Sequence, residues 1–242
     1  MHPTHTPYSA APPLPAVPGS PATTAEAGDP HCLDLTGAGP GLDPSLDPGL
    51  DPYDLGAVAA AKEAGARALW RTWHAGRRPR RVYLVQGPPI ECGAEVIAFT
   101  DPGHLAPDSR AALANSALLW TKGPARPIRF AAPSDPGTKL DGIDRDRVLA
   151  YLAAAPSLLA TTTRTEDVVT GTRTAPTGLR TDGAWVWPEA THHYLDNHRL
   201  APDPALLTHI AMAGYTLPTV TVADLHRALA AVQATTSPKA ER

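Results

Sequence analysis

The first 52 residues of this chain are too rich in proline and too poor in large apolar side chains to fold as a domain on their own. They hold twelve of the 28 prolines and a single aromatic residue, Tyr8. Such a composition cannot bury enough apolar surface to offset the entropy lost on ordering. We therefore predict a disordered Pro/Asp-rich tail over residues 1–52, followed by a folded region of about 190 residues.

A short repeat lies at the end of this tail. The triplet Leu-Asp-Pro occurs three times with a period of four residues, at 42–44, 46–48 and 50–52. Regularly spaced leucines could dock on a partner as a short linear motif. A linker that leads into the folded region explains the repeat more simply, and we favour that interpretation.

Charge is distributed unevenly between the tail and the rest of the chain. Residues 1–61 contain seven acidic residues and no Lys or Arg, whereas the remainder carries 21 basic and 17 acidic residues. The folded region is thus only mildly basic, and this balance argues against a dedicated nucleic-acid binder.

The sequence predicts a cytoplasmic protein that does not enter membranes. Prolines interrupt the N-terminal segment, which also lacks the basic start of a secretory signal. No apolar run reaches the length of a membrane span. Only Cys32 and Cys92 are present, which is typical of a reducing compartment and not of a disulfide framework.

The N-terminal half of the folded region, residues 53–140, reads as one helix followed by short strands. Asp54 is a suitable N-cap, apolar residues recur at helical spacing as far as Trp73, and Gly76 can end the helix, so we predict a helix over 54–75. Gly/Pro clusters then separate runs of strand-forming residues. The predicted strands are Val82–Val85, Ala94–Thr100, Ala117–Thr121 and Ile128–Ala131.

The C-terminal half, residues 141–235, reads as a helix, a β-hairpin and three short helices. Asp144 can cap a helix that Pro156 stops, and Asp182-Gly183 is the dipeptide typical of a tight type I′ turn. The later helices should begin at Pro188, after Asp203 and after Thr221, and residues 236–242 should fray. The predicted fold class is α+β: a small antiparallel sheet with flanking short helices, preceded by the tail. We favour one core shared by the two halves.

A set of short segments in the C-terminal half forms a recognisable pattern. These segments are Gly171-x-Arg173, Leu179–Pro188 with the motif TDGxWVWP, Tyr194-Leu195, Pro202-Asp203-Pro204 and His209-Ile210. On them, residues 143–220 resemble a C-terminal region shared by hypothetical proteins of high-GC Gram-positive bacteria. The resemblance implies a folded unit, and it implies no activity and no catalytic residue.

A cluster of carboxylate and imidazole residues is the first candidate site. It comprises Glu189, His192, His193, Asp196 and His198. On a helix, Glu189 and His192 share a face, and Glu-x-x-His is a spacing that metal-carboxylate sites use. With His209 from the next helix, Glu189 and His192 form the predicted metal-ligand set. Surface histidines without a metal are the simpler interpretation, because the stronger HExxH motif is absent.

Arginines beside two indoles form the second candidate site. They could hold phosphates while an aromatic ring stacks on a base. A solvated helix end whose cations complement the helix dipole is the favoured alternative. The candidate residues are Arg71, Arg77, Arg78, Arg80 and Arg81.

The third candidate site is the predicted hairpin. Trp185 and Trp187 point to one face of their strand, where they could line a groove for a partner, with Arg180 and Asp182 as polar anchors. Equally, both indoles could belong to the core, and we favour the core.

No catalytic signature stands out from the sequence, which lacks a P-loop, a nucleophile elbow and paired-cysteine zinc motifs. The leading prediction is a non-catalytic module that binds another protein, such as an immunity, accessory or scaffold protein of a bacterial cassette, without a cofactor. The alternatives are a metal-dependent enzyme built on the Glu/His cluster and a weak nucleic-acid binder built on the arginines.

Overall fold

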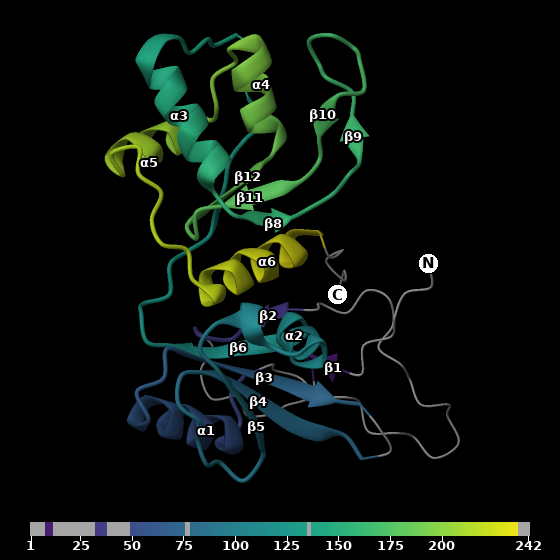
Figure 1. The fold of residues 1–242 in the computed structure, drawn as a ribbon, viewed down its shortest axis with the longest axis vertical. Coiled ribbons are helices and arrows are strands. Elements are labelled where there is room, and N and C mark those ends of the chain that lie inside the picture. The colour runs from purple at the N-terminus through teal and green to yellow at the C-terminus, as the bar shows by residue number, and fades with distance from the viewer. Residues whose placement is uncertain (1–7, 12–31, 38–48, 76–77, 135–136, 237–242) are drawn as a thin grey trace, which may run out of the picture. The chain divides into compact units, whose positions relative to one another are not determined.

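A computed structural model describes residues 8–11, 32–37, 49–75, 78–134 and 137–236 (Figure 1). The chain divides into two compact units, which we call unit 1 and unit 2. Unit 1 is formed by residues 1–125 together with 229–242, and unit 2 by residues 126–228. Helices and mixed sheets occur in both units, so the α+β fold class is confirmed.

Unit 1 is built on a mixed sheet. Its strands are ordered β2-β6-β3-β4-β5, with β1 alongside the end of β3. Neighbours are antiparallel except for β2 with β6 and β4 with β5, which run parallel. The strands are β1 (Tyr8–Ser9), β2 (Cys32–Asp34), β3 (Ala68–His74), β4 (Arg80–Gln86), β5 (Glu95–Phe99) and β6 (Ser116–Thr121).

Two pieces of the predicted tail belong to this sheet. Tyr8–Ser9 pairs with the end of β3, and Cys32–Asp34 pairs with β6. Cys32 is buried, and burial raises the pKa of its thiol to about 12. Within the third Leu-Asp-Pro repeat, Asp51 caps the following helix. The first two repeats lie outside the described residues.

The predicted helix over 54–75 is wrong in its second half. Helix α1 spans Pro52–Glu63, and Gly65 takes a positive φ of 73°, a conformation that ends the helix at little cost. The chain then enters β3, which pairs with β4 over seven residues and with β6 on its other side. Tryptophan and threonine favour strands, and pairing on both sides overrides the helical spacing of the apolar residues.

Helix α1 covers one face of the unit 1 sheet. Its small side chains Ala57 and Ala61 pack with Leu69, Tyr83 and Val85 in a buried cluster. Pro102–His104 form a short 3-10 turn, and α2 (Pro107–Ala114) follows it before β6. The predicted strands at 82–85, 94–100 and 117–121 are β4, β5 and β6, within a few residues at each end.

Unit 2 combines a four-stranded sheet, a two-stranded hairpin and helices (Figure 1). The sheet order is β7-β12-β11-β8, and β9 pairs with β10. The strands are β7 (Arg129–Phe130), β8 (Ser157–Leu159), β9 (Arg164–Thr165), β10 (Ala175–Pro176), β11 (Leu179–Thr181) and β12 (Trp185–Pro188). The helices are α3 (Gly142–Ala154), α4 (Ala190–His198), α5 (Pro204–Met212) and α6 (Val222–Thr236), which continues past the boundary into unit 1.

The hairpin predicted around Asp182-Gly183 is present, but its turn is not the two-residue type I′ turn. Thr181 pairs with Val186, so four residues separate the paired positions, and only Gly183 has a positive φ. The Asp182 carboxylate accepts the backbone N–H groups of Ala184 and Trp185 and so closes the turn itself.

Two of the three later helices begin as their capping residues predict, whereas the helix predicted to start at Pro188 begins at Ala190, because Pro188 is the last residue of β12. The Asp203 side chain accepts the N–H groups of Ala205 and Leu206 at the start of α5. Thr221 and Asp224 bond each other's backbone N–H groups before α6, which is a capping box. None of the helices within the described residues is long and apolar enough to cross a membrane.

Candidate metal centre

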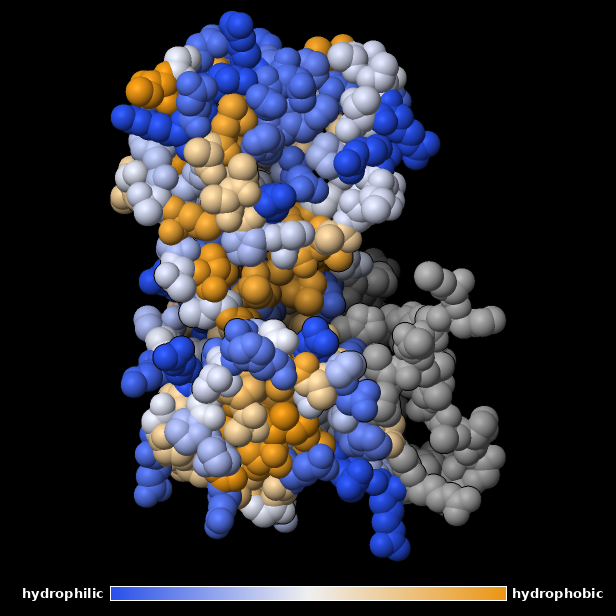
Figure 2. All heavy atoms as spheres, viewed as in Figure 1, coloured by the Kyte–Doolittle hydropathy of each residue, from blue (hydrophilic) through white to orange (hydrophobic). Residues whose placement is uncertain are grey.

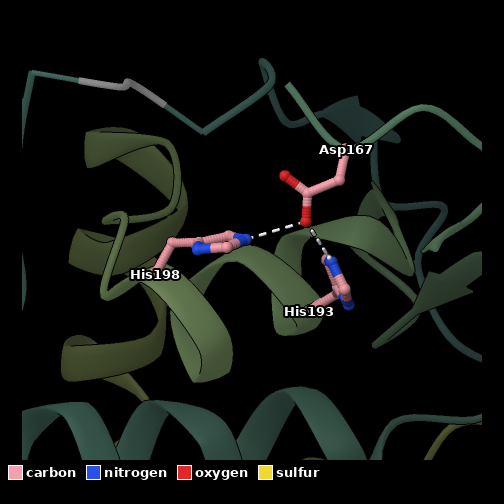
Figure 3. A group of neighbouring side chains, drawn as sticks. All are labelled: Asp167, His193 and His198. Carbon is pink, nitrogen blue, oxygen red and sulfur yellow. Dashed lines mark hydrogen bonds and ion pairs between the residues drawn. The ribbon is translucent and has the colours of Figure 1, made fainter. Parts of the chain in front are cut away.

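The candidate site of unit 2 lies between helix α4 and the loop that joins β9 to β10. Both histidines of the site, His193 and His198, come from α4 and are five residues apart, about 140° around the helix axis. Asp167, in the loop, reaches between them. Figure 3 shows the two rings turned toward one carboxylate oxygen.

The three side chains converge on a single atom. Asp167 Oδ2 lies 2.8 Å from His193 Nε2 and 2.7 Å from His198 Nε2. The carboxylate is buried, with a side-chain exposure of 2%, whereas the two imidazoles are 18% and 14% exposed. Solvent therefore reaches the histidine side of the cluster more easily than the aspartate side.

Local hydrogen bonds hold Asp167 in this position. Its Oδ1 accepts the N–H groups of Val169 and Thr170 at 2.8 and 3.3 Å, and its own N–H donates to the carbonyl of Thr172. The Tyr194 hydroxyl of α4 accepts the N–H of Val168. One oxygen of the carboxylate thus shapes the loop and leaves the other oxygen for the histidines.

The pKa of Asp167 is held well below its usual range. Burial alone would raise it, but hydrogen bonds from His198, His193 and the N–H groups of Val169 and Thr170 outweigh that effect. The carboxylate is therefore ionised and available as an electron-pair donor at neutral pH.

Two imidazoles and one carboxylate form a donor set that divalent transition metals use. The donor atoms all lie within 4.8 Å of one another. Ligand atoms of a tetrahedral zinc ion are about 3.3 Å apart, so the two Asp–His distances would need to open by about 0.5 Å. Among the described residues this is the only such group of three.

The metal-ligand set predicted from the sequence is not assembled. Glu189 forms an ion pair with Arg180 at 3.0 Å, and His209 bonds to Asp182 at 2.7 Å. The side chain of His192 takes part in neither of these two pairs. Glu189 immediately precedes α4 with helical backbone angles, but its carboxylate is bonded to Arg180 and not directed to a shared site with His192 and His209. The cluster predicted from the sequence lies on the correct helix, but the histidines that contact Asp167 are His193 and His198 and not His192.

Asp167 is the member that the sequence reasoning missed. It lies 26 residues before His193 in a loop whose local sequence gives no metal signal. A strand hairpin brings it to α4, and such a contact cannot be read from residue spacing.

The residues proposed as a partner site are mostly internal. Trp185 and Trp187 are 6% and 0% exposed and belong to the core of unit 2, the alternative favoured from the sequence. Asp182 is buried and accepts the Tyr151 hydroxyl, His209 and two backbone N–H groups. Arg180 donates to Glu189 and to two carbonyls at the end of α3.

The arginine group is not a helix end. Arg71 lies on β3 and Arg80 and Arg81 on β4. Arg71 is buried against Asp54, and Arg81 bonds to Asp51, Asp54 and Tyr83, so both guanidinium groups are occupied by internal carboxylates. Arg80 and Arg78 are exposed, and Arg77 lies outside the described residues.

Comparisons with protein-family models, curated proteins and solved structures find no match to this chain. The resemblance noted for residues 143–220 therefore stays a prediction.

Proposed function

We propose that unit 2 binds one divalent transition-metal ion, of which Zn²⁺ is representative, through Asp167, His193 and His198. The convergence of both Nε2 atoms on one buried carboxylate oxygen supports this proposal. Imidazole and carboxylate donors suit zinc and its neighbours better than Mg²⁺ or Ca²⁺, which prefer oxygen ligands.

Three protein ligands leave one tetrahedral position for water or a substrate, and this is the arrangement of catalytic more than of structural zinc sites. A bound metal would lower the pKa of such a water and make it a nucleophile. The chemistry favoured by the site is thus metal-assisted hydrolysis, the metal-dependent alternative drawn from the sequence with a different ligand set.

The experiment is a titration of the chelator-treated full chain with Zn²⁺, and with Co²⁺ for its visible absorption. We expect one ion per chain and a loss of affinity of at least about tenfold to hundredfold in His193→Ala and in His198→Ala, because removing a ligand costs no less than removing a residue that orients one. His192→Ala is the matched control, because it removes the same side chain from the same helix outside the cluster. Absence of binding, or an equal loss in His192→Ala, would contradict the proposal.

A second candidate function is binding of another protein, the leading prediction from the sequence. The supporting observation is the loop after Asp167, where Val168 and Val169 are 71% and 52% exposed although hydrogen bonds fix their N–H groups. Paired apolar side chains on a fixed loop suit a small apolar pocket on a partner.

This candidate is tested by affinity purification from the native host. A stoichiometric partner should be lost in the double variant Val168→Ser/Val169→Ser and kept in Ile143→Ser, which changes an equally exposed apolar residue on α3. A partner that the loop variant retains would exclude this surface.

A further inference from the structure

Asn197, one turn after His193 on α4, contacts the imidazole of a proposed ligand without being a ligand itself. Its amide Nδ2 lies 3.1 Å from His193 Nδ1 and 2.9 Å from the carbonyl oxygen of His193. Only the first contact touches the imidazole, and it does so at the ring nitrogen that does not face Asp167.

The two contacts fix the orientation of the amide. A carbonyl oxygen can only accept, so the atom of Asn197 that faces it must be the donating nitrogen. The same nitrogen then donates to His193 Nδ1, which must offer a lone pair. A neutral imidazole carries one proton, and this proton is thus placed on Nε2, where it points at Asp167.

This tautomer disfavours metal binding at Nε2 of His193. A metal at Nε2 needs the lone pair of that nitrogen, so the proton must move to Nδ1 and would there face the amide N–H₂ of Asn197. Metal-binding histidines usually direct their second N–H at an acceptor, such as a carboxylate or carbonyl. No side chain within the described part of the chain makes a hydrogen bond to His198 Nδ1, so His198 is free of this conflict.

We propose that Asn197 is a positioning residue that sets the metal affinity of the site by holding His193 in the Nε2–H tautomer. The inference rests on the proposed function. It assigns unequal roles to the two histidines. Each donates its Nε2–H to Asp167 in the metal-free chain and must free that nitrogen before it binds a metal, but only His193 would then direct its Nδ1–H at an amide donor.

The surroundings of Asn197 allow it to be changed without disturbing the core. Its side chain is exposed and lines a groove of about 550 Å³ between the start of α3 and the end of α4. In Figure 2 the residues over α3 and α4 are largely hydrophilic. Variants at this position should therefore fold, and their metal affinities can be compared directly.

The first test compares Zn²⁺ affinities of Asn197→Asp, Asn197→Ala and the parent chain at one pH. The carboxylate of Asn197→Asp can accept Nδ1–H, and we expect binding about tenfold tighter. Alanine removes the opposing donor only, so we expect about threefold tighter binding. Asp196→Asn is the charge control, because it alters one neighbouring charge without touching His193, and it should change affinity less than about twofold.

The second test reads the tautomer without metal. Nitrogen-15 NMR of the metal-free chain should report a proton on Nε2 of His193, and this preference should weaken in Asn197→Ala. A proton on Nδ1 in the parent chain would overturn the inference.

The outcomes separate the two proposals. Zinc binding that is equal in all the Asn197 variants would overturn the role of Asn197 and leave the metal centre intact. Absence of binding in both the parent chain and Asn197→Asp would overturn the metal centre itself.

Discussion

Each unit contains a buried aspartate held by two basic side chains, and the two sites differ in the kind of base. In unit 1, Asp54 has no exposed side-chain surface and bonds to Arg71, Arg81 and Tyr83. In unit 2, Asp167 is 2% exposed and is held by His193 and His198. The carboxylates are alike in burial, so the partners determine what each site can do.

A guanidinium stays charged throughout the working range of pH and has no lone pair to offer a metal. The Asp54 site is thus a permanent ion pair that fastens α1 to β3 and β4. An imidazole can carry a proton, lose it or coordinate a metal. The Asp167 site therefore offers nitrogen lone pairs that the Asp54 site lacks, and for this reason the proposed function is assigned to Asp167 and a structural role to Asp54.

The largest expected effect is at Asp54. Asp54→Asn should lower the free energy of unfolding by about 3–5 kcal/mol, because it leaves the buried Arg71 without its counter-charge. Denaturant unfolding measures this loss, and Arg80→Ala, which breaks an exposed pair, should stay within about 0.5 kcal/mol. Equal stabilities for the two variants would show that the buried Asp54 ion pairs contribute no more than the exposed pair of Arg80.

Metal should act on one site only. Zn²⁺ at a hundredfold excess over its dissociation constant should stabilise the parent chain by about 2.7 kcal/mol and leave Asp167→Asn unchanged. Hydrogen exchange should slow in the loop after Asp167 and in α4, and not in α1. Slower exchange in α1 would show that the effect is not local to the candidate site.

A third comparison concerns Asp182, which accepts a hydrogen bond from the uncharged hydroxyl of Tyr151. Tyr151→Phe should destabilise the chain by about 2 kcal/mol, because it removes a buried 2.6 Å hydrogen bond to a charged group. Tyr215→Phe is the matched control, since that hydroxyl makes only an exposed 3.4 Å contact. If both variants unfold at the same denaturant concentration, the Tyr151 hydroxyl contributes nothing.

The smallest expected effect is on acid stability. Burial acts to raise the pKa of Asp182, but hydrogen bonds from Tyr151, Trp185, Ala184 and His209 outweigh it and lower the pKa below that of the unfolded chain. The stability from this group is therefore fully present above the unfolded pKa of about 3.9 and is lost as pH falls from there through the lower folded-state pKa. Asp182→Asn should show a flatter decline of unfolding free energy with acid, and an unchanged slope would contradict this assignment.

Local signals explain what could be predicted from the sequence. Asp203 before Pro204 and the Thr221/Asp224 pair mark helix starts through hydrogen bonds within four residues, and both helices were placed correctly. Strand β3 was misread because Leu69, Trp70 and Trp73 fit helical spacing as well. Its pairing with β4 and β6 is a distant effect that periodicity cannot report.

For the same reason, only part of the candidate site could be predicted from the sequence. His193 and His198 belong to the five-residue cluster noted from the sequence, although neither was a predicted ligand, whereas Asp167 reaches them only through the hairpin of β9 and β10. Arg71 is the converse case. Its position in a basic stretch of the sequence suggests a phosphate-binding residue, but in the fold it forms an ion pair with the buried Asp54.

Unit 1 is assembled from two separate stretches of the chain, with unit 2 in between. During synthesis, residues 126–228 leave the ribosome before residues 229–236, where Gln233 accepts the N–H of Cys32. Domains generally fold as units once their residues have emerged. Unit 2 can therefore fold once residue 228 has emerged, whereas in unit 1 the contact between Cys32 and Gln233 forms only after the final helix has been made.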